Sequence, residues 1–235
     1  MALPAAGDSG ALQTSISAYY YTPVQGFLVG ALVSVGVCLF CLKGNTDVED
    51  ILLNLAGFFA PVAALVSTPG RGSCTSVPGM IQDRDANIAN NVTALLAVAA
   101  VGLLILAVLG LRGRPTKPSR VGYFIALAAW VITAVVFVAD RDFFAANAHY
   151  TAAVLVFVCF VLVVISNARG FGEGTLNRYG VIAALMIFSL IVVGAAGLLG
   201  WDYWLLLLEA LLILLFGIFW VIQTIELWKP GLRPQ

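Results

Sequence analysis

Seven apolar stretches, each long enough to cross a lipid bilayer, restrict the fold of this chain more than any other feature. A helix needs about 17–25 apolar residues to cross roughly 30 Å of hydrocarbon. None of the stretches alternates strictly between apolar and polar residues, which argues against a transmembrane β-barrel. The sequence therefore predicts an all-α integral membrane protein, a seven-helix bundle forming a single membrane domain over residues 1–235. The predicted spans are approximately 24–42, 51–67, 92–111, 121–139, 146–167, 180–199 and 203–226.

The composition supports a membrane protein and excludes several other classes. Hydrophobic residues make up 61% of the chain and charged residues only 10%, against roughly 25% charged residues in soluble domains. The net charge is zero, which leaves no basic surface for nucleic acid. Residues 1–23 contain no Lys or Arg and no continuous apolar core, so they do not resemble a cleavable signal peptide. We expect membrane lipids, and not nucleic acid, as partners.

The cations between the stretches predict the orientation, because cytoplasmic connections carry an excess of Lys and Arg. With the N-terminus outside, nine cations lie inside and three outside, which accounts for all 12. The three on the outside are Arg71, Arg84 and Arg141. The nine on the inside are Lys43, Arg112, Arg114, Lys117, Arg120, Arg169, Arg178, Lys229 and Arg233. The sequence thus predicts an outer N-terminus and an inner C-terminus.

Two stretches contain features that bear on helix packing. In the first, Gly26, Gly30 and Ser34 recur every four residues, a spacing that lets a neighbouring helix approach closely. The second contains Asn54 and Pro61, and the proline removes one backbone hydrogen bond from the helix. Such features occur in transporters and in inert bundles alike, so they indicate packing and not a particular function.

Glu209 is a carboxylate inside the seventh stretch, and an ionisable group in that position is a functional-site hypothesis by default. It lies about 10 Å from Asp202 along the helix, in the predicted outer half. No Lys or Arg lies inside any stretch, so we expect the neutral, protonated form. Three interpretations stay open: a hydrogen bond that holds helices together, a group that carries protons or binds a cation, and a group that binds a lipid head or small ligand.

Other polar residues are expected in the same outer half. The candidates for binding a ligand or an ion are Glu209, His149, Asp140, Asp142 and Tyr20. The two aspartates also precede a helix whose free N–H groups they would cap, and a histidine at a membrane surface often only forms a hydrogen bond. The only histidine begins a helical stripe that continues through Val156, Phe160, Val163 and Asn167.

Several membrane chemistries lack their residues in this chain. A retinal protein needs a lysine in its last helix, and residues 203–226 contain none. Zinc hydrolases of the seven-helix ceramidase and adiponectin-receptor kind use several histidines, and the chain has one, although Asp and Glu also bind zinc. Walker, His-Glu-x-x-His and Gly-x-Ser-x-Gly motifs do not occur. We therefore assign no catalytic residue, no metal ligand and no cofactor, and we favour a non-enzymatic protein.

Three short motifs together resemble a known group of proteins. They are SISAYY at 15–20, His149-Tyr150, and FWVIQTIELW at 219–228. They are similar to motifs of uncharacterised multi-pass bacterial membrane proteins that are common in actinobacteria, and the resemblance covers nearly the whole chain. It implies a bacterial plasma membrane. It transfers no site residue, because the group has no established activity.

The leading functional hypothesis is a cavity open to the outside near Glu209 and His149. That cavity would bind a lipid or small ligand, or pass a proton or an ion. One alternative is an intramembrane metal-dependent lipid hydrolase that uses these residues and the outer aspartates. Another is a structural subunit of a membrane complex, and an oligomer is left open.

Overall fold

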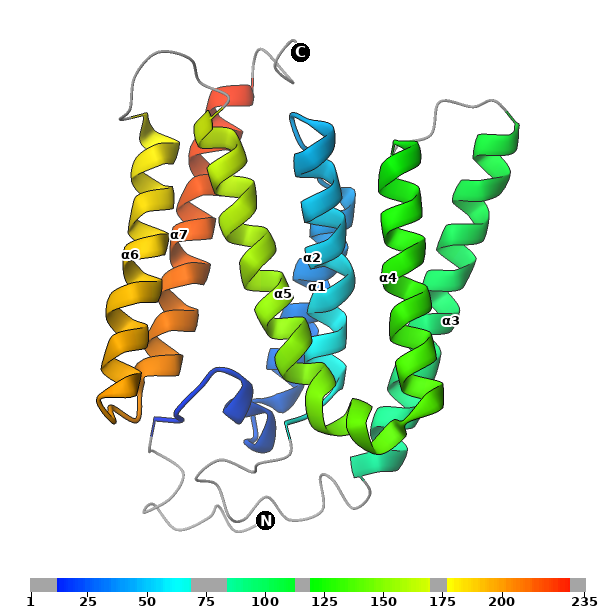
Figure 1. The fold of residues 1–235 in the computed structure, drawn as a ribbon, viewed down its shortest axis with the longest axis horizontal. Coiled ribbons are helices and arrows are strands. Elements are labelled where there is room, and N and C mark those ends of the chain that lie inside the picture. Colours follow the sequence, from blue (N-terminus) through cyan, green and yellow to red (C-terminus); the bar gives the residue numbers. More distant parts are fainter. Residues whose placement is uncertain (1–11, 69–83, 113–118, 170–176, 229–235) are drawn as a thin grey trace. The chain divides into compact units, whose positions relative to one another are not determined.

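The computed structural model describes residues 12–68, 84–112, 119–169 and 177–228. These residues form seven α-helices and one short 3-10 helix, η1 (Ser17–Tyr21), as Figure 1 shows. The predicted all-α fold is confirmed. The α-helices are α1 (Gln25–Cys41), α2 (Asp47–Leu65), α3 (Arg84–Leu111), α4 (Arg120–Ala139), α5 (Arg141–Arg169), α6 (Arg178–Leu198) and α7 (Trp204–Leu227).

Helix length and hydropathy mark a multi-pass membrane protein. Among the described residues, six helices are long and apolar enough to cross a membrane, and α1 is an apolar helix of 17 residues. The helix α3 begins at Arg84 and not at residue 92, and α5 begins at Arg141 and not at residue 146. Apolar residues mark only the part of a helix in hydrocarbon, whereas backbone hydrogen bonding continues into the polar residues beyond it.

The described residues cluster into two compact units. The first unit takes its residues from 1–30, 68–82 and 160–234, and the second from 31–67 and 83–159. The second unit therefore contains the end of α1, all of α2, α3 and α4, and the beginning of α5. The first contains η1, the end of α5, α6 and α7. The single membrane domain expected from the sequence stays a prediction.

Apolar side chains of α2, α3 and α4 form the core of the second unit, in which these three helices pack pairwise. Val62 of α2 and Val92 of α3 are almost completely buried, and Phe137 of α4 packs edge-to-face against Phe144 of α5. The indole N–H of Trp130 donates to the Leu96 carbonyl over 2.9 Å. That bond satisfies the polar atom of an aromatic side chain within an apolar surrounding.

Close contact between α1 and α2 depends on two glycines. A Cβ atom on Gly36 would lie 2.7 Å from Cδ of Pro61 and 2.9 Å from the Gly57 carbonyl oxygen. That carbonyl receives no helical hydrogen bond from residue 61, because proline has no N–H. The close approach predicted for Gly26 and Gly30 is not seen, since no described atom lies within 4 Å of a Cβ built on either.

The first unit is organised by the helix pair α6 and α7, which Figure 1 shows side by side. Their connection turns at Gly200, whose φ of 88° lies in the left-handed region that favours glycine. In the core of the unit, the rings of Phe160 and Phe216 stack with centroids 3.8 Å apart. Phe219 also packs against the ring of Tyr179, and both side chains are completely buried.

Candidate functional site

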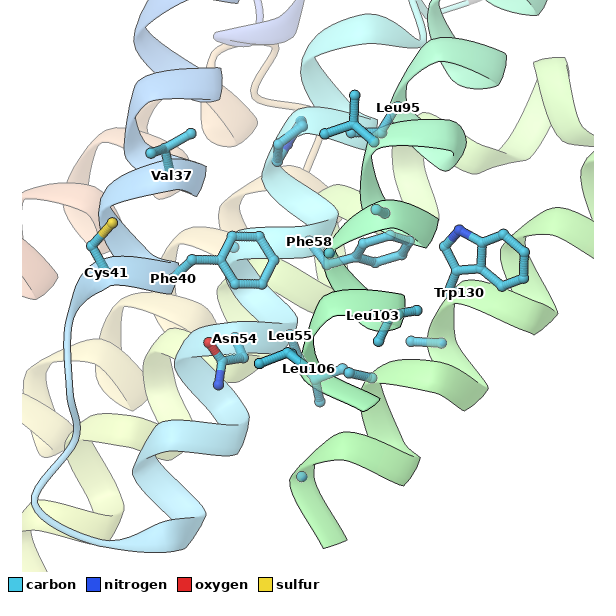
Figure 2. A pocket seen from close by; sticks show the side chains of 18 of the residues that line it. Val37, Phe40, Cys41, Asn54, Leu55, Phe58, Leu95, Leu103, Leu106 and Trp130 are labelled. Atoms are coloured by element: carbon cyan, nitrogen blue, oxygen red, sulfur yellow. The ribbon is translucent and has the colours of Figure 1, made fainter. Parts of the chain in front are cut away.

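A cavity of about 940 Å³ lies in the second unit, between the end of α1 and the helices α2, α3 and α4 (Figure 2). Its volume falls in the range of about 300–1,000 Å³ typical of ligand sites. Apolar side chains dominate its walls, including Val37 and Phe40 from α1, Phe58 from α2, Leu103 from α3 and Trp130 from α4. Such a lining favours an apolar ligand.

The charged groups of this cavity lie at one end, while the amide of Asn91 also lines it, one turn beyond Leu95 on α3. Lys43 and Asp50 line it at the turn between α1 and α2, and Asn54 lines it one helical turn farther along α2, about 6 Å from Asp50. Figure 2 shows Asn54 on the side of this turn, with Val37 and Leu95 toward the other end. The cavity therefore changes from charged to polar to apolar along α2.

The turn that carries the charged end is held by hydrogen bonds to its backbone. Thr46 caps α2 by accepting from the Glu49 N–H over 3.2 Å. The carboxylate of Glu49 accepts from the Asn45 N–H over 2.8 Å, and that of Asp50 accepts from the Gly44 N–H. This is close to a capping box, which supplies acceptors for N–H groups that a helix start leaves unpaired.

The cavity also opens sideways. Val98 and Ile105 of α3 line it and are 71% and 54% exposed, and Phe40 of α1 is 49% exposed. In a membrane, exposed apolar side chains face lipid chains, which are as apolar as the side chains themselves. A lipid chain therefore has a lateral route into the cavity.

Glu209 is buried in the first unit, where it contacts the segment that precedes η1. Its carboxylate accepts a hydrogen bond from the Ile16 N–H over 2.7 Å. In return, the Leu206 N–H in the first turn of α7 donates to the Thr14 carbonyl over 3.0 Å. Each segment thus satisfies a backbone N–H of the other. Glu209 faces the protein interior and acts as an anchor for the N-terminal segment.

His149 lies in the second unit, beside the C-terminal end of α2. Its Nδ1 is 2.9 Å from the Ala63 carbonyl oxygen and 2.8 Å from that of Val66. Carbonyl oxygens only accept hydrogen bonds, so Nδ1 carries a proton. The predicted stripe of α5 that begins at His149 is buried throughout.

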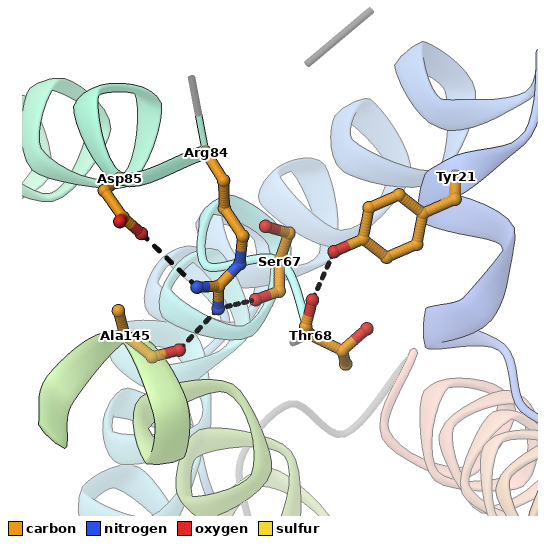
Figure 3. A network of polar contacts seen from close by, with 6 residues as sticks. All are labelled: Tyr21, Ser67, Thr68, Arg84, Asp85 and Ala145. Atoms are coloured by element: carbon orange, nitrogen blue, oxygen red, sulfur yellow. Dashed lines mark hydrogen bonds and ion pairs between the residues drawn. The ribbon is translucent and has the colours of Figure 1, made fainter. Parts of the chain in front are cut away.

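Arg84 of α3 joins the segment that follows α2 to the beginning of α5 (Figure 3). Its Nη2 donates to Ser67 over 2.8 Å and to Ala145 over 2.6 Å, and Nη1 pairs with Asp85 at 3.4 Å. Figure 3 also shows a hydrogen bond within the first unit, which the Tyr21 hydroxyl donates to the Thr68 carbonyl. Ser67 follows the end of α2 and Ala145 lies in α5, so Arg84 links these two parts of the second unit.

The remaining candidates have local roles. Asp140 caps α5, since its Oδ1 accepts from the Phe143 N–H over 2.8 Å. Asp142 is exposed in the first turn of α5, and Tyr20 is half-buried with its ring edge-to-face against Tyr21 at 5.5 Å. The second unit thus holds His149 and both aspartates, while Glu209 and Tyr20 belong to the first. The shared site of these five residues stays a prediction.

The cavity was not predicted from the sequence, although the sequence contains one signal for it. Asn54 is a polar residue inside an apolar stretch, one turn from Asp50. Within the described part of the chain, its side chain has no hydrogen-bond partner. An amide at that depth without a partner is a signal for a ligand site, but only when the neighbouring helices are known.

Comparisons of the chain with protein-family models, with curated proteins and with solved structures found no match. Within the described residues, no group of three His, Cys, Asp or Glu side chains is placed to hold a metal ion. Functional conclusions therefore rest on the geometry of the helices and of the cavity.

Proposed function

We propose that this polytopic membrane protein binds a membrane lipid in the cavity of the second unit. The observation that supports this most directly is the cavity itself, which is apolar, opens sideways and has its charged residues at one end. An amphipathic ligand matches this arrangement, because its polar head would meet the charged end and its apolar chain would meet the apolar walls. The ligand class is one that the sequence suggested, but the proposed place is this cavity and not the surroundings of Glu209 and His149.

The length of the cavity along α2 supports a lipid chain as the occupant. Asn54 and Leu65 both line it, and the separation of 11 positions between them corresponds to roughly 16 Å of helix. One leaflet contributes half of a hydrocarbon core of about 30 Å, which is about 15 Å. A chain from one leaflet therefore fits between the polar level of Asn54 and the far end.

We also propose that the protein lies in a bacterial plasma membrane with its N-terminus outside. The distribution of nine cations against three and the resemblance of its motifs to bacterial multi-pass proteins support this. The charged end of the cavity, at Lys43, would then lie at the inner surface, and its lipid would come from the inner leaflet.

Filling the cavity tests the binding proposal. Gly102 lines it, and none of the described atoms lies within 4 Å of a Cβ built there, so Gly102→Phe places a ring in the space of the lipid chain. Native mass spectrometry of the purified protein measures the fraction that retains a phospholipid. We expect the variant to retain less phospholipid than the wild type. The decrease should correspond to a roughly tenfold weaker affinity, equivalent to about 1.4 kcal/mol.

Gly217→Phe is the matched control. Gly217 lies within α7 and does not line the cavity, and an added Cβ there also has no atom of the described residues within 4 Å. Both substitutions place the same side chain in a helix, so a general effect on folding would appear in each. Equal lipid retention by the two variants would contradict the proposal.

A further inference from the structure

The charged end of the cavity contains one group of each sign. Lys43 and Asp50 both line the cavity, Lys43 in the turn between α1 and α2 and Asp50 near the beginning of α2. Lys43 is exposed and Asp50 is half-buried. A ligand that places both a negative and a positive group at this turn would find a partner for each.

We infer that the lipid bound in this cavity is a zwitterionic phospholipid, with its phosphate at Lys43 and its amine at Asp50. This inference rests on the proposed lipid binding and specifies its head-group class. A purely anionic head would pair with Lys43 but would be repelled by Asp50, because like charges within reach of each other are unfavourable. A neutral head would leave both charges without a ligand partner.

Both side chains retain the capacity to bind such a head. The lysine ammonium has three donors, so a phosphate can be added to the contacts that Lys43 already makes. Asp50 accepts from the Gly44 N–H through Oδ1, and its second carboxylate oxygen is available to accept from an amine. The same backbone bond fixes the carboxylate at the cavity end, which lowers the entropic cost of binding.

Asn54 offers the lipid a further polar contact below its head group. It lies one turn from Asp50 within the apolar wall, about 6 Å deeper along α2. The ester carbonyls of a phospholipid follow its phosphate at the start of the acyl chains. The amide N–H₂ of Asn54 is a donor, and a lipid ester oxygen would satisfy it at that level.

Lipid exchange with defined head groups tests the inference. The purified protein is equilibrated with phosphatidylethanolamine or phosphatidylglycerol of identical acyl chains, and native mass spectrometry measures the retention of each. We expect the wild-type protein to prefer the zwitterionic lipid by roughly twofold to fivefold, the range for one exposed ion pair. Asp50→Asn should remove that preference, while its amide oxygen still accepts from Gly44.

Asp47→Asn serves as the matched control, because Asp47 lies in the same first turn of α2 but does not line the cavity. It should keep the wild-type preference. Equal retention of both lipids by the wild type, or a preference that Asp50→Asn leaves unchanged, overturns the head-group inference alone. Retention of neither lipid, or retention that Gly102→Phe does not reduce, overturns the proposed function.

Discussion

The Glu209 carboxylate and the Ile16 N–H form a hydrogen bond between residues separated by 193 positions. A carboxyl group accepts this bond in either protonation state, so the contact requires no buried cation. Together with the bond from Leu206 to Thr14, it holds the N-terminal segment at the start of α7. Of the three interpretations open for Glu209, the described contacts support the packing role.

Glu209→Leu should release that segment. The substitution removes the acceptor of the Ile16 N–H, and leaving such a group without a partner costs about 1–3 kcal/mol. We expect faster hydrogen exchange at residues 13–22 and a lower thermal unfolding temperature in detergent. Glu209→Gln should resemble the wild type, because the glutamine oxygen also accepts from an N–H.

A different result would move Glu209 into a ligand site. If Glu209→Leu leaves exchange at residues 13–22 unchanged, the anchor role is wrong. If Glu209→Gln abolishes a ligand-dependent thermal shift, the carboxylate binds that ligand, as the first functional hypothesis proposed.

At the level of helices, the contact between α1 and α2 positions the cavity. Gly36 lies against Pro61 and Gly57, and the side chains of Val37 and Phe40 that follow on α1 line the cavity. Any atom added to Gly36 would push the two helices apart, since protein interiors leave no spare volume at such contacts.

Gly36→Ala should therefore destabilise the protein by about 1–3 kcal/mol, the usual cost of overpacking. Gly30→Ala is the control within the same helix, because no atom lies within 4 Å of its added Cβ, and it should leave stability unchanged or slightly higher. Thermal unfolding in detergent measures both. Equal unfolding temperatures would show that the contact at Gly36 does not limit the packing of α1.

At the level of the whole molecule, the described helices are long and apolar enough to cross a membrane, and the charges of their connections predict the orientation. Reporter fusions that are active on only one side of a bacterial membrane test that orientation. We expect fusions within residues 68–83 to report the outside, and fusions within 112–120 or after residue 228 to report the inside. The reverse pattern would contradict the outer N-terminus and place Lys43 at the outer surface.

Hydropathy and charge determine by themselves the membrane class, the all-α fold and the approximate position of each helix. These properties are local, because a run of apolar residues must satisfy its backbone within itself in lipid. The alignment of one stripe of α5 follows from the same local periodicity, and the structure shows that this stripe is buried.

Only the tertiary structure decided which residues meet. Gly36 packs on Pro61 while Gly26 and Gly30 have open surroundings, Glu209 binds the Ile16 N–H, and Lys43 and Asp50 share the end of one cavity. A stripe of small residues and a buried carboxylate look the same in a sequence whichever neighbour they meet. Their partners depend on how separate helices cross, and helix crossing is set by side-chain packing over long sequence separations.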